Sequence, residues 1–169
     1  ILKSLNLAHH FALNKQVAGI VNCPIDKNHL NKKNIGVTEF LAAKCNIRKN
    51  TEAMVIKNNN LMVSPITTHL NVKSISKKLK KSLIVNKVKT INNWYKKFFK
   101  RKPKIAILGL NPHNGELQKN SEEQRIIIPA INKLKRLGIF LKGPYASDTI
   151  FINDYKKYDI IIGMYHDQV

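Results

Sequence analysis

Three histidines in this sequence each follow an apolar segment that has the composition of a β-strand. His69 comes after LMVSPITT, His113 after IAILGLNP and His166 after DIIIGMY. Parallel strands bring their carboxyl ends to one edge of a sheet, so the three imidazoles are expected at the same edge. Neutral imidazole is a good ligand for Zn²⁺ and similar ions, and three protein ligands leave positions open for a substrate. Taken singly, each is more typical of a loop histidine bonded to the backbone, but together they predict a metal site.

Carboxylates lie close to these histidines in the sequence. Asp167 adjoins His166, Glu116 follows His113, and Asp148 lies in the segment GPYASDT, which is predicted to be a loop. Each could orient a metal ligand or transfer a proton, although a solvated surface carboxylate is the more common case. No G-x-G-x-x-G motif follows a strand, so the pattern shows no ordinary dinucleotide-binding turn. The residue types alone leave a metal-dependent hydrolase open as well.

The elements that would position these residues alternate between helices and strands. Helical spacing or helix-start residues are found over 1–13, 38–44, 74–99 (in two pieces) and 121–137, and strands are predicted over 17–21, 52–57, 61–67, 104–110 and 159–164. Several of the strands are apolar throughout, which is typical of strands covered on both faces. The sequence therefore predicts an α/β fold with a largely parallel sheet flanked by helices.

The composition is strongly basic. The chain has 30 Lys and Arg against 10 Asp and Glu, a formal net charge of +20, which raises the alternative of a basic nucleic-acid-binding protein. The densest basic runs, 77–81 and 96–102, fall in helical segments, where lysines typically form solvated faces. The aromatic residues near them have a spacing more typical of a helix core: Trp94, Tyr95, Phe98 and Phe99. We therefore expect no nucleic-acid partner.

Cysteine usage and hydropathy favour a reduced, cytoplasmic protein. Cys23 and Cys45 do not have zinc-knuckle spacing, and no segment resembles a signal peptide or a membrane span of roughly 20 apolar residues. The chain begins at Ile1 and ends at Val169, directly after a His-Asp-Gln run. We interpret it as a piece of a longer protein.

Several linked motifs resemble the 4-hydroxythreonine-4-phosphate dehydrogenase family. They keep the family's order and spacing over almost the whole chain: CPIDK at 23–27, GVTEFLA at 36–42, TTHL at 67–70, GLNPHNGE at 109–116, GPYASDT at 143–149 and MYHDQ at 164–168. The resemblance implies an α/β/α fold akin to isocitrate and isopropylmalate dehydrogenases. The present chain would be a partial catalytic region, 1–169, without the family's N-terminal and C-terminal parts.

The resemblance also implies a reaction and a set of site residues. The family oxidises 4-phosphooxy-L-threonine with NAD to the 3-oxo acid, which decarboxylates to 3-amino-2-oxopropyl phosphate in pyridoxal 5'-phosphate (vitamin B6) biosynthesis. A divalent metal (Zn, Co or Mg) is implied at His69, His113 and His166, with the third histidine supplied across a homodimer that shares its active sites. Asp148 is implied as a catalytic residue at the substrate site and Thr38 as a substrate-binding residue. Within one chain, His69 and His113 would then be the near pair.

Two departures from the family pattern are visible. The family's Gly-His-Thr-Glu is Gly-Val-Thr-Glu here, and Val37 cannot make the polar substrate contact of a histidine. A related dehydrogenase acting on 4-phospho-threonate or 4-phospho-erythronate is therefore the alternative. The family's C-terminal segment, which carries much of the NAD site, is absent. The chain by itself is accordingly predicted to be inactive.

Overall fold

The computed structural model describes residues 1–26, 36–48 and 51–169, so Lys27, the last residue of CPIDK, lies outside the described residues. The chain divides into two compact units, Ile1–Glu52 and Ala53–Val169. None of the described helices is both long enough and apolar enough to cross a membrane.

The described part of the first unit contains two helices, α1 (Leu2–Leu13) and α2 (Val37–Lys44). Its apolar cluster is small, with Leu5 and Phe40 buried and a few partly buried neighbours. The predicted strand over 17–21 is wrong, because this stretch forms bends and irregular backbone. Val21 is fully exposed, and no described strand of this unit offers a partner for pairing. An apolar run this short does not form a strand without such a partner.

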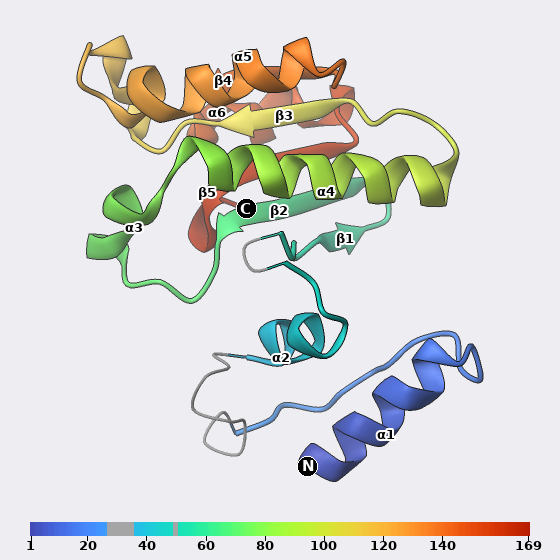
Figure 1. Ribbon diagram of the computed structural model, residues 1–169. Coiled ribbons are helices and arrows are strands. Elements are labelled where there is room, and N and C mark those ends of the chain that lie inside the picture. Colours follow the sequence, from blue (N-terminus) through green and yellow to red (C-terminus); the bar gives the residue numbers. More distant parts are fainter. Residues whose placement is uncertain (27–35, 49–50) are drawn as a thin grey trace. The chain divides into compact units, whose positions relative to one another are not determined.

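The second unit is built on one five-stranded sheet (Figure 1). Its strands are β1 (Ile56–Asn58), β2 (Leu61–Thr67), β3 (Ile105–Leu108), β4 (Leu141–Tyr145) and β5 (Ile160–Tyr165). They lie in the order β1-β2-β5-β3-β4. Only β1 is antiparallel to its neighbour, whereas the β2–β5, β5–β3 and β3–β4 pairs are all parallel. The predicted α/β class with a largely parallel sheet is confirmed.

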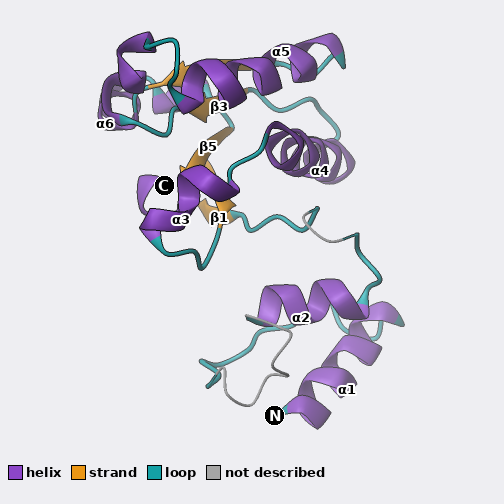
Figure 2. Cartoon of the chain, turned by 60° about the vertical axis from the view of Figure 1, so that its left-hand side comes forward, coloured by secondary structure: helices purple, strands orange, loops and turns teal. Residues whose placement is uncertain are grey.

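Helices cover both faces of this sheet (Figure 2). Its helices are α3 (Val72–Lys78), α4 (Lys81–Phe99), a π-helical turn (Glu123–Ile127) that runs into α5 (Ile128–Arg136), and α6 (Ser147–Asn153). Ile105 and Ile107 of β3 pack with the buried residues of α4 and α5. Ala106 and Leu108 pack with Ile150 of α6. The strand is apolar throughout because both of its faces are buried.

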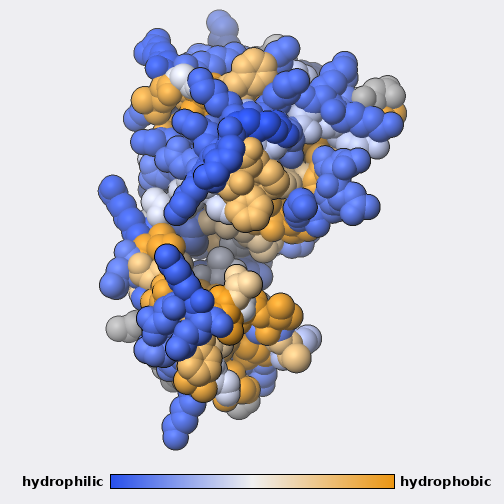
Figure 3. All heavy atoms as spheres, turned by 90° about the vertical axis from the view of Figure 1, so that its right-hand side faces the viewer, coloured by the Kyte–Doolittle hydropathy of each residue, from blue (hydrophilic) through white to orange (hydrophobic). Residues whose placement is uncertain are grey.

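The aromatic end of α4 differs from the expectation of a buried cluster. The buried face of the helix continues at three- and four-residue steps through Ile84, Val88 and Ile91 to Tyr95. Trp94 and Phe98 therefore fall off that face, and they are 39% and 69% exposed. Their rings stack on one another with centroids 5.9 Å apart. Figure 3 shows that hydrophobic side chains reach the surface between hydrophilic ones.

The sequence-based prediction missed β4 and α6, and it placed Asp148 in a loop. The segment LKGPY has no apolar run, yet it pairs with β3 as an edge strand of the sheet. Gly143 approaches the neighbouring strand so closely that a Cβ atom there would lie 2.2 Å from the Ile107 carbonyl oxygen. Asp148 lies instead in the first turn of α6, where a carboxylate is favoured by the helix dipole.

Candidate active site

The carboxyl ends of three neighbouring strands form the edge of the sheet at which the histidines lie. β5 lies between β2 and β3 and is parallel to both. His69 follows β2, His166 follows β5 and His113 follows β3, and all three side chains are exposed. The expectation that the three histidines follow strands ending at one edge is thus confirmed by the pairing of the strands.

His69 and His166 line the same cavity, which has a volume of about 260 Å³. Its other lining residues come from the ends of β2 and β5 and from α3: Thr67, Leu70, Val72, Ile75, Tyr165 and Asp167. The Asp167 carboxylate lies beside His166, with 3.5 Å between its Oδ1 and the imidazole Nδ1. The sequence had paired His69 with His113. In this structure His69 shares a cavity with His166, because β5 lies between β2 and β3, and the pairing of His69 with His113 stays a prediction.

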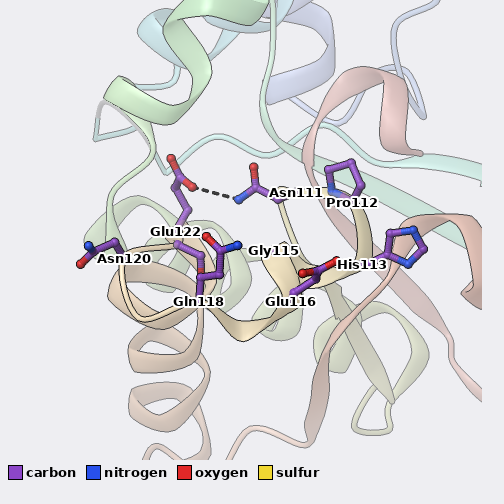
Figure 4. A pocket seen from close by; sticks show the side chains of 9 residues that line it. Asn111, Pro112, His113, Gly115, Glu116, Gln118, Asn120 and Glu122 are labelled. Carbon is purple, nitrogen blue, oxygen red and sulfur yellow. Dashed lines mark hydrogen bonds between the residues drawn. The ribbon is translucent and has the colours of Figure 1, made fainter.

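His113 lines a second cavity, of about 550 Å³ (Figure 4). Polar side chains of the turn after β3 and of the helix start at 121–123 surround it: Asn111, Glu116, Gln118, Asn120, Ser121 and Glu122. Glu122 accepts hydrogen bonds from the Ser76 hydroxyl and, at 2.9 Å, from the Asn111 side chain. These two bonds, that of Ser76 first, lower the pKa of Glu122 despite its partial burial, so this wall of the cavity carries a negative charge at neutral pH.

Imidazole donors suit a divalent cation, but one chain does not bring them together. Within residues 1–26, 36–48 and 51–169, no three His, Cys, Asp or Glu side chains are grouped so that they could hold a metal ion. Two histidines share one cavity and the third lines another. The donor chemistry therefore fits a metal, and the geometry of the single chain provides part of a site. The complete set of three ligands stays a prediction.

His69 and His113 also share an unusual backbone conformation. Their φ angles are +51° and +49°, in the left-handed region, and Asn114, Gly115 and Glu116 continue the left-handed turn with φ between +48° and +61°. This region is disfavoured for residues with a Cβ atom. Such conformations persist only where surrounding contacts hold them, and they concentrate at functional sites.

A buried carboxylate lies under the turn that carries His113. Glu123 is 0% exposed, and its Oε1 accepts hydrogen bonds from the backbone N–H groups of Leu110 (2.7 Å) and Asn111 (2.8 Å). Its Oε2 accepts a third from the Asn111 side chain at 3.0 Å. Burial alone would raise the pKa of Glu123, but these hydrogen bonds outweigh it and lower the pKa, so the buried side chain is ionised.

Two further polar side chains tie the three strand ends together. The buried Gln168 accepts from the backbone N–H of Met164 (2.7 Å) and donates to the carbonyl oxygens of Gly109 (2.8 Å) and Leu110 (3.3 Å). It therefore joins the turn after β5 to the turn after β3. The buried hydroxyl of Thr67, the last residue of β2, donates to the Met164 carbonyl at 2.7 Å.

The remaining predicted site residues lie in two places. Asp148 is exposed on α6 of the second unit. Thr38 is exposed on the first turn of α2, in the first unit. Val37 precedes it and packs against the small apolar cluster of that unit. The site role of each of these residues stays a prediction.

A family profile, described as pyridoxal phosphate biosynthetic protein PdxA, matches residues 1–169. The chain belongs to this family. It is 40% identical over 163 residues to the 4-hydroxythreonine-4-phosphate dehydrogenase of Sulfurihydrogenibium sp. (strain YO3AOP1), covering 92% of this chain and 49% of that protein. For the enzyme of the same name from Aquifex aeolicus (strain VF5), the identity is 37%, with coverages of 93% and 49%.

A solved structure agrees with these relatives. The crystal structure of 4-hydroxythreonine-4-phosphate dehydrogenase from Klebsiella pneumoniae has a TM-score of 0.88 to this chain at 32% identity, covering 98% of this chain and 52% of that one. The family resemblance read from the motifs is thus confirmed. The chain spans about half the length of the curated relatives it matches.

Within this PdxA-family chain, sequence reasoning missed Glu123 and Gln168. Both lie inside recognisable stretches, SEEQ at 121–124 and MYHDQ at 164–168, but nothing in the pattern marked them as buried. SEEQ has the form of a helix-capping box, and the Gln124 N–H lies 3.4 Å from the Ser121 hydroxyl.

Proposed function

We propose that this chain is part of an NAD-dependent dehydrogenase that oxidises 4-phosphooxy-L-threonine to its 3-oxo acid in pyridoxal 5'-phosphate biosynthesis. The 3-oxo acid would then lose CO₂ to give 3-amino-2-oxopropyl phosphate. The observation that supports the proposal most directly is the PdxA family match over residues 1–169. The relatives are named 4-hydroxythreonine-4-phosphate dehydrogenase, after a phosphorylated hydroxy amino acid of the same kind.

In this proposal the exposed histidines at the edge of the sheet hold a divalent metal. His69 and His113 of one chain and a His166 supplied by a second copy would complete the ligand set, because one chain groups no three donors among its described residues. A bound ion would lower the pKa of the substrate hydroxyl, and NAD would accept the hydride. The homodimer, the metal and NAD are all parts of the proposal.

The chain's own polar residues have separate parts in this scheme. The Asp148 carboxylate, exposed at the start of α6, would exchange a proton with the substrate. The hydroxyl of Thr38, in the first turn of α2, would donate a hydrogen bond to the substrate, at a helix end whose free N–H groups favour anions. The residues that bind NAD are not assigned to positions in this chain. We therefore propose that the 169-residue chain alone does not turn over substrate.

Val37 favours a second candidate substrate. An apolar side chain beside Thr38 removes a polar contact that a histidine would make to an anionic substrate, and here that side chain packs against Leu5 and Phe40. A dehydrogenase of 4-phospho-threonate or 4-phospho-erythronate is the alternative. In the full-length gene product, Val37→His should lower the KM for 4-phosphooxy-L-threonine about tenfold to a hundredfold, the worth of one hydrogen bond to a charged group. No change, together with turnover of 4-phospho-erythronate, would favour the alternative.

The deciding experiment follows NADH formation by the full-length gene product with Co²⁺ or Zn²⁺ and 4-phosphooxy-L-threonine. His69→Ala, His113→Ala and His166→Ala should each lower kcat/KM by at least about a hundredfold, since each removes one metal ligand. His10→Ala is the matched control, because His10 is exposed on α1 and bonds only to Asn14 among the described residues. Unchanged rates in the three histidine variants, in protein that folds and binds NAD, would refute the metal-dependent dehydrogenase.

A further inference from the structure

The buried carboxylate of Glu123 has no part in the reaction proposed above. Its three hydrogen bonds all come from one short stretch, since Leu110 and Asn111 supply two backbone N–H groups and one side-chain amide. These residues stand between the end of β3 and the left-handed turn. A carboxylate can accept all three bonds at once, whereas a glutamine would turn a donor toward the Asn111 amide.

Two glycines show how closely the turn surrounds this carboxylate. A Cβ atom on Gly109 would lie 3.1 Å from Oε1 of Glu123, and one on Gly115 would lie 2.9 Å from its Oε2. The chain therefore passes over the carboxylate twice, before and after His113. Only residues without a Cβ atom allow an approach this close.

The turn itself needs such support. His113, Asn114 and Glu116 all have positive φ, and each of them carries a Cβ atom. Other bonds reach its two ends, since Gln168 donates to the Gly109 and Leu110 carbonyl oxygens and the Asn114 side chain donates to the Pro144 carbonyl at 3.2 Å. A run of left-handed residues that lost the three Glu123 bonds would be held less firmly and could relax to other conformations.

We infer that Glu123 is a positioning residue, whose buried carboxylate fixes the left-handed turn after β3 and so presents the His113 imidazole to its cavity. The inference rests on the proposed function, because it gives the fixed turn the task of presenting a ligand. Glu123 itself touches neither substrate nor cofactor in this scheme. It acts through the backbone of residues 110 and 111.

The test compares Glu123→Gln and Glu123→Ala with Asp154→Asn in the 169-residue chain. Asp154→Asn also removes one negative charge, but at an exposed i,i+3 pair with Lys157. Amide hydrogen exchange at Leu110 and Asn111, followed by NMR, should accelerate roughly tenfold to a hundredfold in Glu123→Gln and further in Glu123→Ala. The His113 ring resonances should shift in the same two variants and stay unchanged in Asp154→Asn.

Exchange in the sheet separates positioning from a general structural role. The Ile107 and Ile161 amides, in β3 and β5, should keep their wild-type exchange rates in Glu123→Gln. Equal acceleration there would mean that Glu123 only stabilises the fold, and unchanged exchange at 110 and 111 would mean that it does not hold the turn. Either result overturns the inference. If Glu123→Ala fails to fold, Glu123→Gln alone decides it.

A Co²⁺ titration distinguishes this inference from the proposed function. In the wild-type chain Co²⁺ should broaden the His113 ring resonances, and Glu123→Gln should raise the Co²⁺ concentration needed by about tenfold or more. If Co²⁺ leaves His113 of the wild-type chain unaffected at every concentration, the metal part of the proposed function fails for this chain. The exchange rates at 110 and 111 still decide the role of Glu123 in that case.

Discussion

The two turns that carry His113 and His69 have the same role, but different hydrogen bonds hold them in place. Each presents an imidazole at the same edge of the sheet, and each places its histidine at a positive φ. The turn after β3 is held from below by Glu123 and by Gln168. The segment after β2 is anchored only where the strand ends, through the Thr67 hydroxyl, and no side chain of residues 68–70 makes a hydrogen bond to the described part of the chain.

This difference indicates that the His113 turn is rigidly fixed and that the His69 segment is held more loosely. Buried, charge-assisted hydrogen bonds fix the geometry of the turn that carries His113. The His69 segment can adjust its position at little cost, since few buried groups would lose a partner. We therefore expect substitutions under the His113 turn to cost more stability than substitutions near His69.

The largest effect is expected from Gln168→Leu. This change removes the acceptor for the Met164 N–H and the donor to the Gly109 and Leu110 carbonyl oxygens, in a buried position. Backbone groups left without a partner cost about 1–3 kcal/mol each, so the free energy of unfolding should fall by about 3 kcal/mol. Urea unfolding of the 169-residue chain measures it. A loss below that of Thr67→Val would contradict the comparison.

Thr67→Val makes the corresponding change at the end of β2. It should lower the free energy of unfolding by less than Gln168→Leu does. Valine has nearly the shape of threonine, so the change removes one buried hydrogen bond, to the Met164 carbonyl, and little packing. We expect the free energy of unfolding to fall by about 1–2 kcal/mol. Thr149→Val is the control, because the exposed Thr149 hydroxyl makes a long 3.3 Å bond to the Ala146 carbonyl and should contribute almost nothing.

Acid should weaken the support under the His113 turn selectively. Hydrogen bonds hold the pKa of Glu123 below its ordinary value of 4.5 in the folded protein. A depressed pKa contributes stability that is present above pH 4.5 and is lost as the pH falls through the folded value. The difference in the free energy of unfolding between the wild type and Glu123→Gln should therefore become smaller below pH 4.5. Asp159 also has a lowered pKa, but its partners are Arg101 and Lys104, so it titrates alike in both proteins and cancels in the difference.

The sequence predicted the parts of the molecule in which one local pattern decides the structure. β2, α4 and the histidines at the strand ends follow from apolar periodicity and from the shared edge of parallel strands. β4 was not predicted, because it forms only by pairing with β3, which is distant in sequence. The order of β5 between β2 and β3, which joins His69 to His166, is likewise a tertiary property.

The support of the two histidine turns could not be read from the sequence for the same reason. In the sequence, Glu123 looks like an ordinary glutamate at the start of a helix. It becomes buried only when the turn after β3 folds over it. No sequence signal indicates the positive φ of His69 and His113, since neither position carries the Gly or Asn typical of left-handed backbone. A histidine kept in such a conformation is retained at a cost in stability, which can be measured.

The smallest effect should be a gain in stability when either histidine is replaced by glycine. Left-handed backbone costs a residue with a Cβ atom about 1–2 kcal/mol, and glycine gives back about 0.5–1 kcal/mol through the extra freedom of its unfolded chain. His69→Gly and His113→Gly should therefore raise the free energy of unfolding by about 0.5 kcal/mol. Lys100→Gly is the matched control, since Lys100 ends α4 with φ +57° far from any proposed ligand role. A loss of stability in His69→Gly alone would show that the β2 side holds its histidine more firmly than its hydrogen bonds indicate.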